Sequence, residues 1–80
     1  MSEALTAKKK VVGLKQTRRA VSAGQAVQVY LACDAESRLT EPLLECCHTA
    51  GIPVETEWTM KQLGKACGID VGAAAAAAVD

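Results

Sequence analysis

Aromatic residues are scarce in this sequence. It has no phenylalanine, and Tyr30 and Trp58 are its only aromatic side chains. The hydrophobic fraction is 50%, but alanine supplies much of it. A chain of this length buries only about 60–65% of the surface that its unfolded form exposes, so we expect one domain over residues 1–80 with a thin core. A thin core leaves little depth for an enclosed active site, which disfavours an enzyme.

Long apolar runs are also missing. No stretch approaches the roughly 20 apolar residues that a membrane-spanning helix needs. The lysines near the start, Lys8 to Lys10, are not followed by the apolar segment of a secretory signal. We therefore expect a cytoplasmic protein without a membrane segment.

The cysteines lack the spacing of a metal site. Cys33, Cys46, Cys47 and Cys67 include no Cys-x-x-Cys pair, and His48 does not complete one. Neighbouring helical residues point about 100° apart, so Cys46 and Cys47 cannot readily hold one ion. We expect reduced, packed thiols with no metal and no cofactor. The sequence also lacks a phosphate-binding G-x-x-x-x-G-K-[ST] motif and a nucleophile–base pair, so we expect no enzymatic activity.

Acidic residues are absent between Glu3 and Asp34, although the formal net charge of the chain is zero. That stretch holds the basic residues Lys8, Lys9, Lys10, Lys15, Arg18 and Arg19. A localised basic surface favours a polyanionic partner. The composition leaves open the alternative of an ordinary solvated helix face.

Helical and extended patterns alternate along the chain, which predicts one α/β domain. Ser2 can cap a short helix that reaches about Ala7, and Lys10 to Val12 resembles a short strand. A helix is expected from about Leu14 to Ala23. The next strand should be central in the sheet, because apolar side chains recur at every second residue, namely Val27, Val29, Leu31 and Cys33.

A third helix should start near Ser37 or Thr40, because Pro42 is tolerated only in a first turn. Its predicted buried stripe is Leu39, Leu43, Leu44 and Cys47. Gly51 should end this helix.

The last third of the chain begins with a short predicted strand at 53–57. Thr59 and Gln62 then match the capping box of a helix that runs to about Cys67. The alanine run that follows is ambiguous. Its propensity favours a helix, whereas its brevity and the preceding Gly72 argue against one, so the residues alone leave the choice open.

Three stretches, GLKQTRRAVSAG, QVYLACDAES and LGKACGIDVGAA, occur in an order that resembles the kink-turn-binding ribosomal protein family, most closely its small bacterial YbxF-type members. The resemblance covers nearly the whole chain. It implies a compact three-layer α-β-α sandwich around a mixed four-stranded sheet, with residues 74–79 as a strand. It also implies a monomeric, non-catalytic protein that binds kink-turns in ribosomal or regulatory RNA.

The resemblance places RNA recognition on the helix that follows Gly13. Family members carry Asn-Glu and a later Lys at the positions of Lys15, Gln16 and Arg19, and use them at tandem sheared G·A pairs. Lys15 and Gln16 can still donate to purine acceptors, and Gln16 can also accept. Arg18 and Arg19 are expected to supply most of the phosphate attraction.

By the same resemblance, a second contact comes from the loop after the last helix, here Ile69, Asp70, Val71 and Gly72. Its apolar side chains can pack on an unstacked nucleotide. Glu36 matches an acidic residue after the central strand, and Lys61 lies near a family lysine position that Met60 occupies here. The alternatives are that Ile69 and Val71 belong to the core, and that the protein is an accessory or ribosomal component held mainly by protein contacts.

Overall fold

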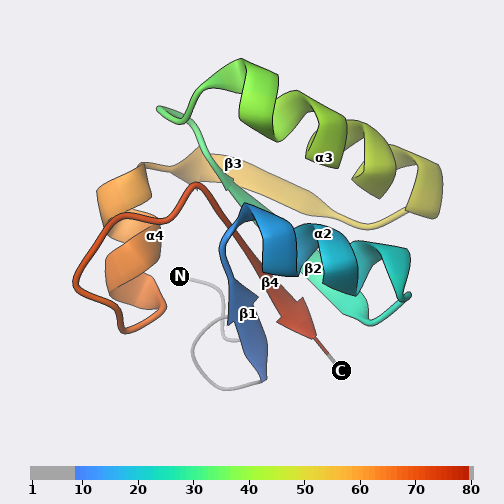
Figure 1. The fold of residues 1–80 in the computed structure, drawn as a ribbon, viewed down its shortest axis with the longest axis horizontal. Helices are drawn as coiled ribbons and strands as arrows, with labels where there is room; N and C mark the ends of the chain where they lie inside the picture. The colour runs from blue at the N-terminus through green and yellow to red at the C-terminus, as the bar shows by residue number, and fades with distance from the viewer. Residues whose placement is uncertain (1–8, 80) are drawn as a thin grey trace.

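A mixed four-stranded sheet forms the centre of the computed structural model, which describes residues 9–79. Its strands are β1 (Lys10–Val12), β2 (Ala26–Ala32), β3 (Val54–Trp58) and β4 (Ala75–Val79). They lie in the order β1-β4-β2-β3 (Figure 1). β4 pairs antiparallel with both β1 and β2, while β2 and β3 are parallel. The short helix expected from Ser2 to Ala7 lies outside the described residues.

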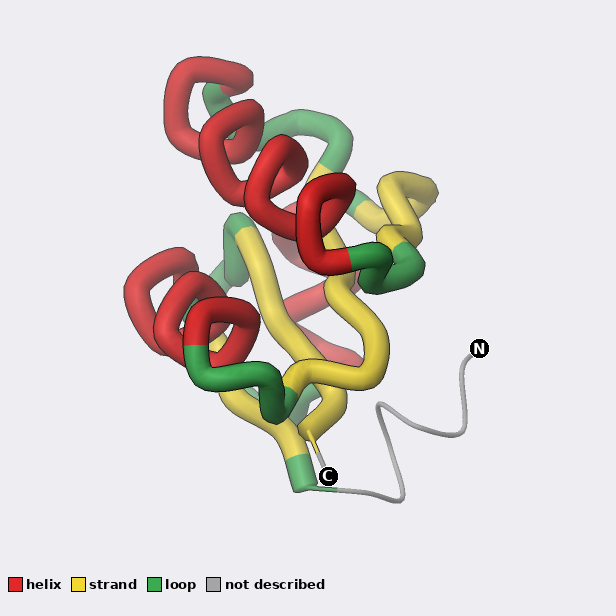
Figure 2. The backbone as a smooth tube through the Cα atoms, turned by 90° about the vertical axis from the view of Figure 1, so that its right-hand side faces the viewer, coloured by secondary structure: helices red, strands yellow, loops and turns green. Residues whose placement is uncertain are grey.

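Three helices flank the sheet within residues 9–79: α2 (Leu14–Ser22), α3 (Ser37–Ala50) and α4 (Met60–Ala66). α2 and α3 lie side by side on one face of the sheet (Figure 2), and α4 covers the other face. Each face has its own hydrophobic cluster, with Val29 and Leu31 on the α2–α3 side and Tyr30 and Leu63 on the α4 side. This confirms the three-layer sandwich with a mixed four-stranded sheet. None of the helices in this part of the chain has the length and hydrophobicity that crossing a membrane requires.

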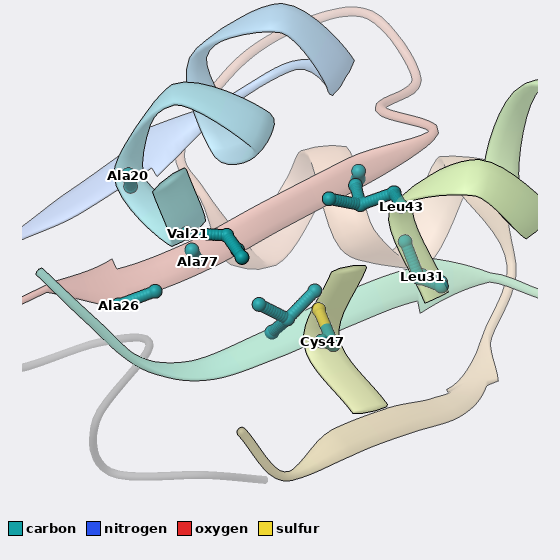
Figure 3. Close-up of a cluster of buried hydrophobic side chains, with 9 residues drawn as sticks. Ala20, Val21, Ala26, Leu31, Leu43, Cys47 and Ala77 are labelled. Carbon is teal, nitrogen blue, oxygen red and sulfur yellow. The ribbon is translucent and has the colours of Figure 1, made fainter. Parts of the chain in front are cut away.

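The alanine run forms strand β4 rather than a helix. β4 lies between β1 and β2, and the side chains from Ala75 to Ala78 are completely buried. Ala75 and Ala77 belong to the cluster beneath α2 and α3, where Figure 3 shows Ala77 close to Val21. Ala76 belongs to the cluster on the α4 side. Hydrogen bonding to two neighbouring strands therefore outweighs the helix propensity of alanine.

The alternating pattern of β2 is interrupted near its start. Val29 and Leu31 are buried as predicted, but Val27 is 49% exposed. The pairing with β4 shifts register just after Ala26, as in a β-bulge, so Ala26 joins the same buried cluster as Val29. Cys33, the last member of the predicted stripe, lies beyond the end of β2 and is exposed. The predicted stripe is thus wrong at both of its ends, while the central position of β2 is confirmed.

Pro42 lies in the second turn of α3, because the helix begins at Ser37. The prediction that Pro42 belongs to a first turn is therefore wrong. Pro42 is exposed, so water can hydrate the carbonyl that loses its helical hydrogen bond. The predicted stripe of α3 is buried only in part, with Leu43 and Cys47 buried, Leu44 half-buried and Leu39 48% exposed.

The predicted helix boundary signals hold in the structure. Gly51 ends α3 in the left-handed region, with φ 71°. At the start of α4, the side chain of Thr59 accepts from the backbone N–H of Gln62 at 3.1 Å, and the side chain of Gln62 accepts from the backbone N–H of Thr59 at 3.0 Å. This reciprocal pair is the predicted capping box. The strand predicted at 53–57 is shifted by one residue, to Val54–Trp58.

Candidate nucleic-acid interface

Most of the residues predicted to bind RNA lie near one end of the sheet, which we call the site end. β1 ends there and β4 begins there, and the N–H of Gly13 donates to the carbonyl of Ala75 at 2.8 Å. β2 also ends there, because it is antiparallel to β4; the N–H of Ala32 donates to the carbonyl of Ala74 at 2.9 Å. β3 is parallel to β2 and ends beside it. α2, α3 and α4 each follow one of these strands, so all of them start at the site end (Figure 1).

The three helix N-termini make the site end favourable for anions. The N-terminus of a helix carries roughly half a positive charge, together with backbone N–H groups that lack helical partners. The first turns of α2, α3 and α4 contain no acidic residue, although Glu36 precedes α3 as its N-cap. A phosphate group near this end would therefore meet a favourable field.

α2 presents a continuous polar surface at the site end. Arg18, Lys15, Arg19 and Gln16 follow one another around the helix, in that order, over about 160° of its circumference, and all four are exposed. Thr17 points the opposite way and is completely buried. The predicted binding residues of α2 therefore share one solvent-facing side, while the other side anchors the helix to the sheet.

Gly13 allows α2 to begin directly after β1. Its φ of 106° is a conformation that residues with a side chain rarely adopt. A β-carbon at Gly13 would lie 3.4 Å from Oε1 of Gln16, so the amide of Gln16 folds back over the glycine. The geometry places this amide at the entrance to α2.

The loop 69–72 joins α4 to β4 and presents its side chains to solvent. Val71 is 70% exposed and Ile69 is 36% exposed, so neither is a core residue. Asp70 and Gly72 are exposed as well. The loop leads into β4, whose first carbonyl binds the N–H of Gly13. The end of the loop, Gly72, is therefore three residues from the strand residue that pairs with Gly13, while its start, Ile69, bonds to Gly64 in the second half of α4.

The backbone of the loop is held firmly against α4. The N–H of Ile69 donates to the carbonyl of Gly64, and the N–H of Ala73 donates to the carbonyl of Met60, both at 3.0 Å. Gly72 lies close to Met60, because a β-carbon at Gly72 would be 3.2 Å from Cβ of Met60. The exposed apolar side chains are thus carried on a fixed backbone, which lowers the entropy that is lost when a partner binds.

Asp34 belongs to the site end but was not among the residues predicted from the sequence. Its carboxylate accepts a hydrogen bond from the N–H of Met60 at 2.8 Å, which links the turn after β2 to the first turn of α4. Met60 in turn accepts from Ala73, at the end of the loop. The sequence offered one signal for Asp34, namely that it is an acidic residue just after a buried strand. Its partner lies 26 positions away, however, and no local pattern marks that pairing.

Glu36 and Lys61 stand at the starts of two helices. Glu36 is the N-cap of α3, and Lys61 is the second residue of α4; both are exposed. The carboxylate of Glu36 forms an ion pair with Nε of Arg38. The side chains are 61% and 81% exposed, so this pair contributes little to stability. Both predicted residues therefore lie at the site end and are accessible.

The cysteines are free thiols. Burial, followed by the neighbouring Cys46, raises the pKa of the Cys47 thiol, and burial raises the pKa of Cys67. Both therefore favour the neutral form, which is a poor nucleophile and a poor metal ligand. Within residues 9–79, no group of three or more His, Cys, Asp and Glu side chains is placed to hold a metal ion.

Comparison with known proteins agrees with this architecture. The sequence matches the ribosomal protein L7Ae/L30e/S12e/Gadd45 family over residues 1–80. It is 51% identical to an RNA-binding protein of Caldanaerobacter subterraneus subsp. tengcongensis over 71 residues. These residues cover 89% of this chain and 87% of that protein. It is 47% identical to the RNA-binding protein YbxF of Geobacillus stearothermophilus over 73 residues, and these residues cover 91% of this chain and 89% of that protein.

Among solved structures, the fold is similar to that of the 15.5 kD RNA-binding protein of Giardia lamblia. The TM-score is 0.87 at 23% identity, over 98% of this chain and 66% of the other. The family match over all 80 residues and the identity of 47% to 51% over most of the length of two relatives lead to one conclusion: the chain belongs to the ribosomal protein L7Ae/L30e/S12e/Gadd45 family.

Proposed function

We propose that the protein is a non-catalytic RNA-binding protein that recognises kink-turns with tandem sheared G·A pairs, as a cytoplasmic monomer acting on ribosomal or regulatory RNA. The observation that carries the proposal is that the exposed polar side of α2 starts at the site end and that the exposed apolar loop 69–72 leads into β4 at the same end. Relatives that are 47% to 51% identical over most of the chain are named RNA-binding proteins, which supports the same assignment.

The polar side of α2 supplies two kinds of RNA contact. Lys15 and Gln16, in the first turn, donate to base edges where sheared G·A pairs widen the groove, and Gln16 can also accept from an exocyclic amine. Arg18 and Arg19 lie one turn further along and neutralise phosphates. Gly13 keeps the entrance to the helix free of a side chain, so an RNA backbone can approach closely.

The loop 69–72 supplies the second contact. Ile69 and Val71 pack against a nucleotide that is unstacked at the bend, and this covers apolar surface that is otherwise in water. Asp70 must face away from the phosphates. Lys61 and Glu36, at the starts of α4 and α3, flank this contact as a cation and a hydrogen-bond acceptor.

A binding experiment with matched RNAs tests the proposal. The protein is titrated with a kink-turn RNA, with the same RNA in which both G·A pairs are replaced by Watson–Crick pairs, and with a straight duplex of equal length. We expect the kink-turn to bind about a hundredfold more tightly than the other two at physiological salt. Equal affinity for all three RNAs would mean that the attraction is nonspecific. No binding to any of them would favour an accessory or ribosomal component that is held mainly by protein contacts.

A further inference from the structure

A groove runs between α2 and α3 beside the polar side of α2. It has a volume of about 350 Å³ and is lined by Leu14, Lys15 and Arg18 from α2 and by Arg38, Leu39 and Pro42 from α3. These residues lie in the first two turns of each helix, so the groove opens near the site end. We call it the α2–α3 groove.

The α2–α3 groove is lined by cations from both helices. Lys15, Arg18 and Arg38 line it, and no acidic residue is among the described residues that do. The continuation of the groove toward the other ends of the helices has the opposite character, since Glu45 and Cys46 line it and no cation does. The positive charge is therefore concentrated beside the candidate RNA surface, where it attracts a polyanion.

Arg38 is placed for such a contact but belongs to none of the surfaces described above. Its side chain is 81% exposed, and its ion pair with Glu36 is made through Nε. A guanidinium group offers five N–H donors, so a residue held through Nε keeps its terminal nitrogens for a phosphate. The ion pair with Glu36 therefore orients Arg38 through Nε and leaves its terminal nitrogens accessible.

Apolar side chains also line the α2–α3 groove. Leu39 is 48% exposed, although its position in α3 predicted burial, and half-buried Leu14 lines the same groove. A groove lined by both cations and apolar side chains matches the chemistry of a nucleotide unit, whose phosphate is charged and whose sugar and base faces are not. A contact with RNA thus explains why Leu39 is exposed next to Arg18 and Arg38, whereas packing gives no reason for it.

We propose that the α2–α3 groove binds the sugar–phosphate backbone of the same RNA that α2 recognises, with Arg38 as a phosphate contact and Leu39 packing against the sugar. The inference rests on the proposed function and extends the RNA surface from α2 onto α3. Arg18, at the edge of α2 nearest to α3, joins the two surfaces. The RNA strand that meets Lys15 continues across Arg18 to Arg38.

The test compares Arg38→Gln with a charge-matched control. Lys9→Gln removes one exposed cation just before β1, at the opposite end of the sheet from the site end. For each variant, the affinity for the kink-turn RNA is measured as a function of salt. We expect Arg38→Gln to reduce the slope of log affinity against log salt by roughly 0.7–0.9, the value for one lost phosphate contact, and Lys9→Gln to leave the slope near that of the parent.

A double variant separates a phosphate contact from an indirect effect. If Arg38 only screens the charge of Glu36, the variant carrying both Glu36→Gln and Arg38→Gln will recover the affinity and the salt slope of Glu36→Gln alone. If Arg38 binds phosphate, the double variant will keep the reduced slope. Recovery would overturn the inference, and so would an Arg38→Gln slope equal to that of Lys9→Gln. Both outcomes leave the proposed function intact, because the parent would still prefer the kink-turn over the straight duplex. If the parent shows no such preference, the proposed function itself is wrong.

Discussion

Gly64 in α4 lies directly against the backbone carbonyl of Val71. A β-carbon at Gly64 would be 2.1 Å from that oxygen and 3.2 Å from the Cα of Gly72. The opposing atoms belong to the backbone, so no change of rotamer can relieve the clash. Only glycine at this position allows the loop 69–72 to lie on α4.

We expect Gly64→Ala to displace the loop and to lower the free energy of unfolding by about 1–3 kcal/mol, because the added methyl group overpacks the contact. This loss occurs even though alanine is intrinsically the better helix former. Urea denaturation measures it, and Lys65→Ala, at the exposed next position, should stay within about 0.5 kcal/mol of the parent. Parent-like stability of Gly64→Ala would mean that the loop is not held by this contact.

β4 should not tolerate larger side chains. Ala75 is completely buried between the sheet and the helices α2 and α3, so we expect Ala75→Leu to lower the free energy of unfolding by about 1–3 kcal/mol. Ala50→Leu adds the same volume at the exposed end of α3 and serves as the control, with little change expected. Equal effects of the two substitutions in urea denaturation would contradict tight packing around β4.

Removing the buried hydroxyl of Thr17 should stabilise the protein. This oxygen is buried and has no hydrogen-bond partner among the described residues. Valine has a similar shape and carries no polar atom, so we expect Thr17→Val to raise the free energy of unfolding by about 1 kcal/mol. RNA affinity should not change, because Thr17 points away from the exposed side of α2. Thr49→Val, at an exposed position of α3, is the control. A loss of stability in Thr17→Val would show that the hydroxyl of Thr17 has a hydrogen-bond partner.

The thiols should differ in reactivity and in their effect on alkaline stability. At neutral pH a thiol reagent should modify exposed Cys33 first, and should reach Cys47 and Cys67 only on unfolding. Burial raises the folded-state pKa of Cys47. Its contribution to stability is therefore fully present below the unfolded pKa and is lost as the pH rises through the folded pKa.

Urea denaturation of the parent and of Cys47→Ala across alkaline pH checks this sign, since the parent should lose stability more steeply than the variant. Replacement of both Cys46 and Cys47 by alanine should leave RNA affinity nearly unchanged. Stoichiometric zinc in protein purified without added metal would contradict the assignment of these cysteines as packed thiols.

Two residues of α2 should respond differently to RNA sequence. We expect Gln16→Ala to cost about 1–3 kcal/mol of binding free energy on a kink-turn with intact G·A pairs and almost nothing on a straight duplex, because only base contacts carry sequence information. Arg18→Ala should weaken both complexes and reduce the salt slope by roughly one unit. If Lys15→Ala and Gln16→Ala both bind the kink-turn as tightly as the parent, α2 is only a solvated basic helix.

Local backbone chemistry determined several features that could be predicted from the sequence alone. The left-handed glycine at Gly51 and the capping box of Thr59 and Gln62 mark helix ends, because their effects act within one turn of the chain. The exposed polar side of α2 follows in the same way from the spacing of its residues. The location of the predicted RNA contacts on a helix start and a loop therefore followed from short-range patterns and from the family resemblance.

Contacts between distant residues decided the rest. Residue propensity did not decide whether the alanine run forms a helix or a strand. Its position in the sheet between β1 and β2 made it a strand. The register shift after Ala26 exposed Val27, and the carboxylate of Asp34 met the first turn of α4 only once the sheet had brought them together. These outcomes could not be predicted from local patterns, because the free energy that selects them comes from hydrogen bonds and packing between segments that lie far apart in the chain.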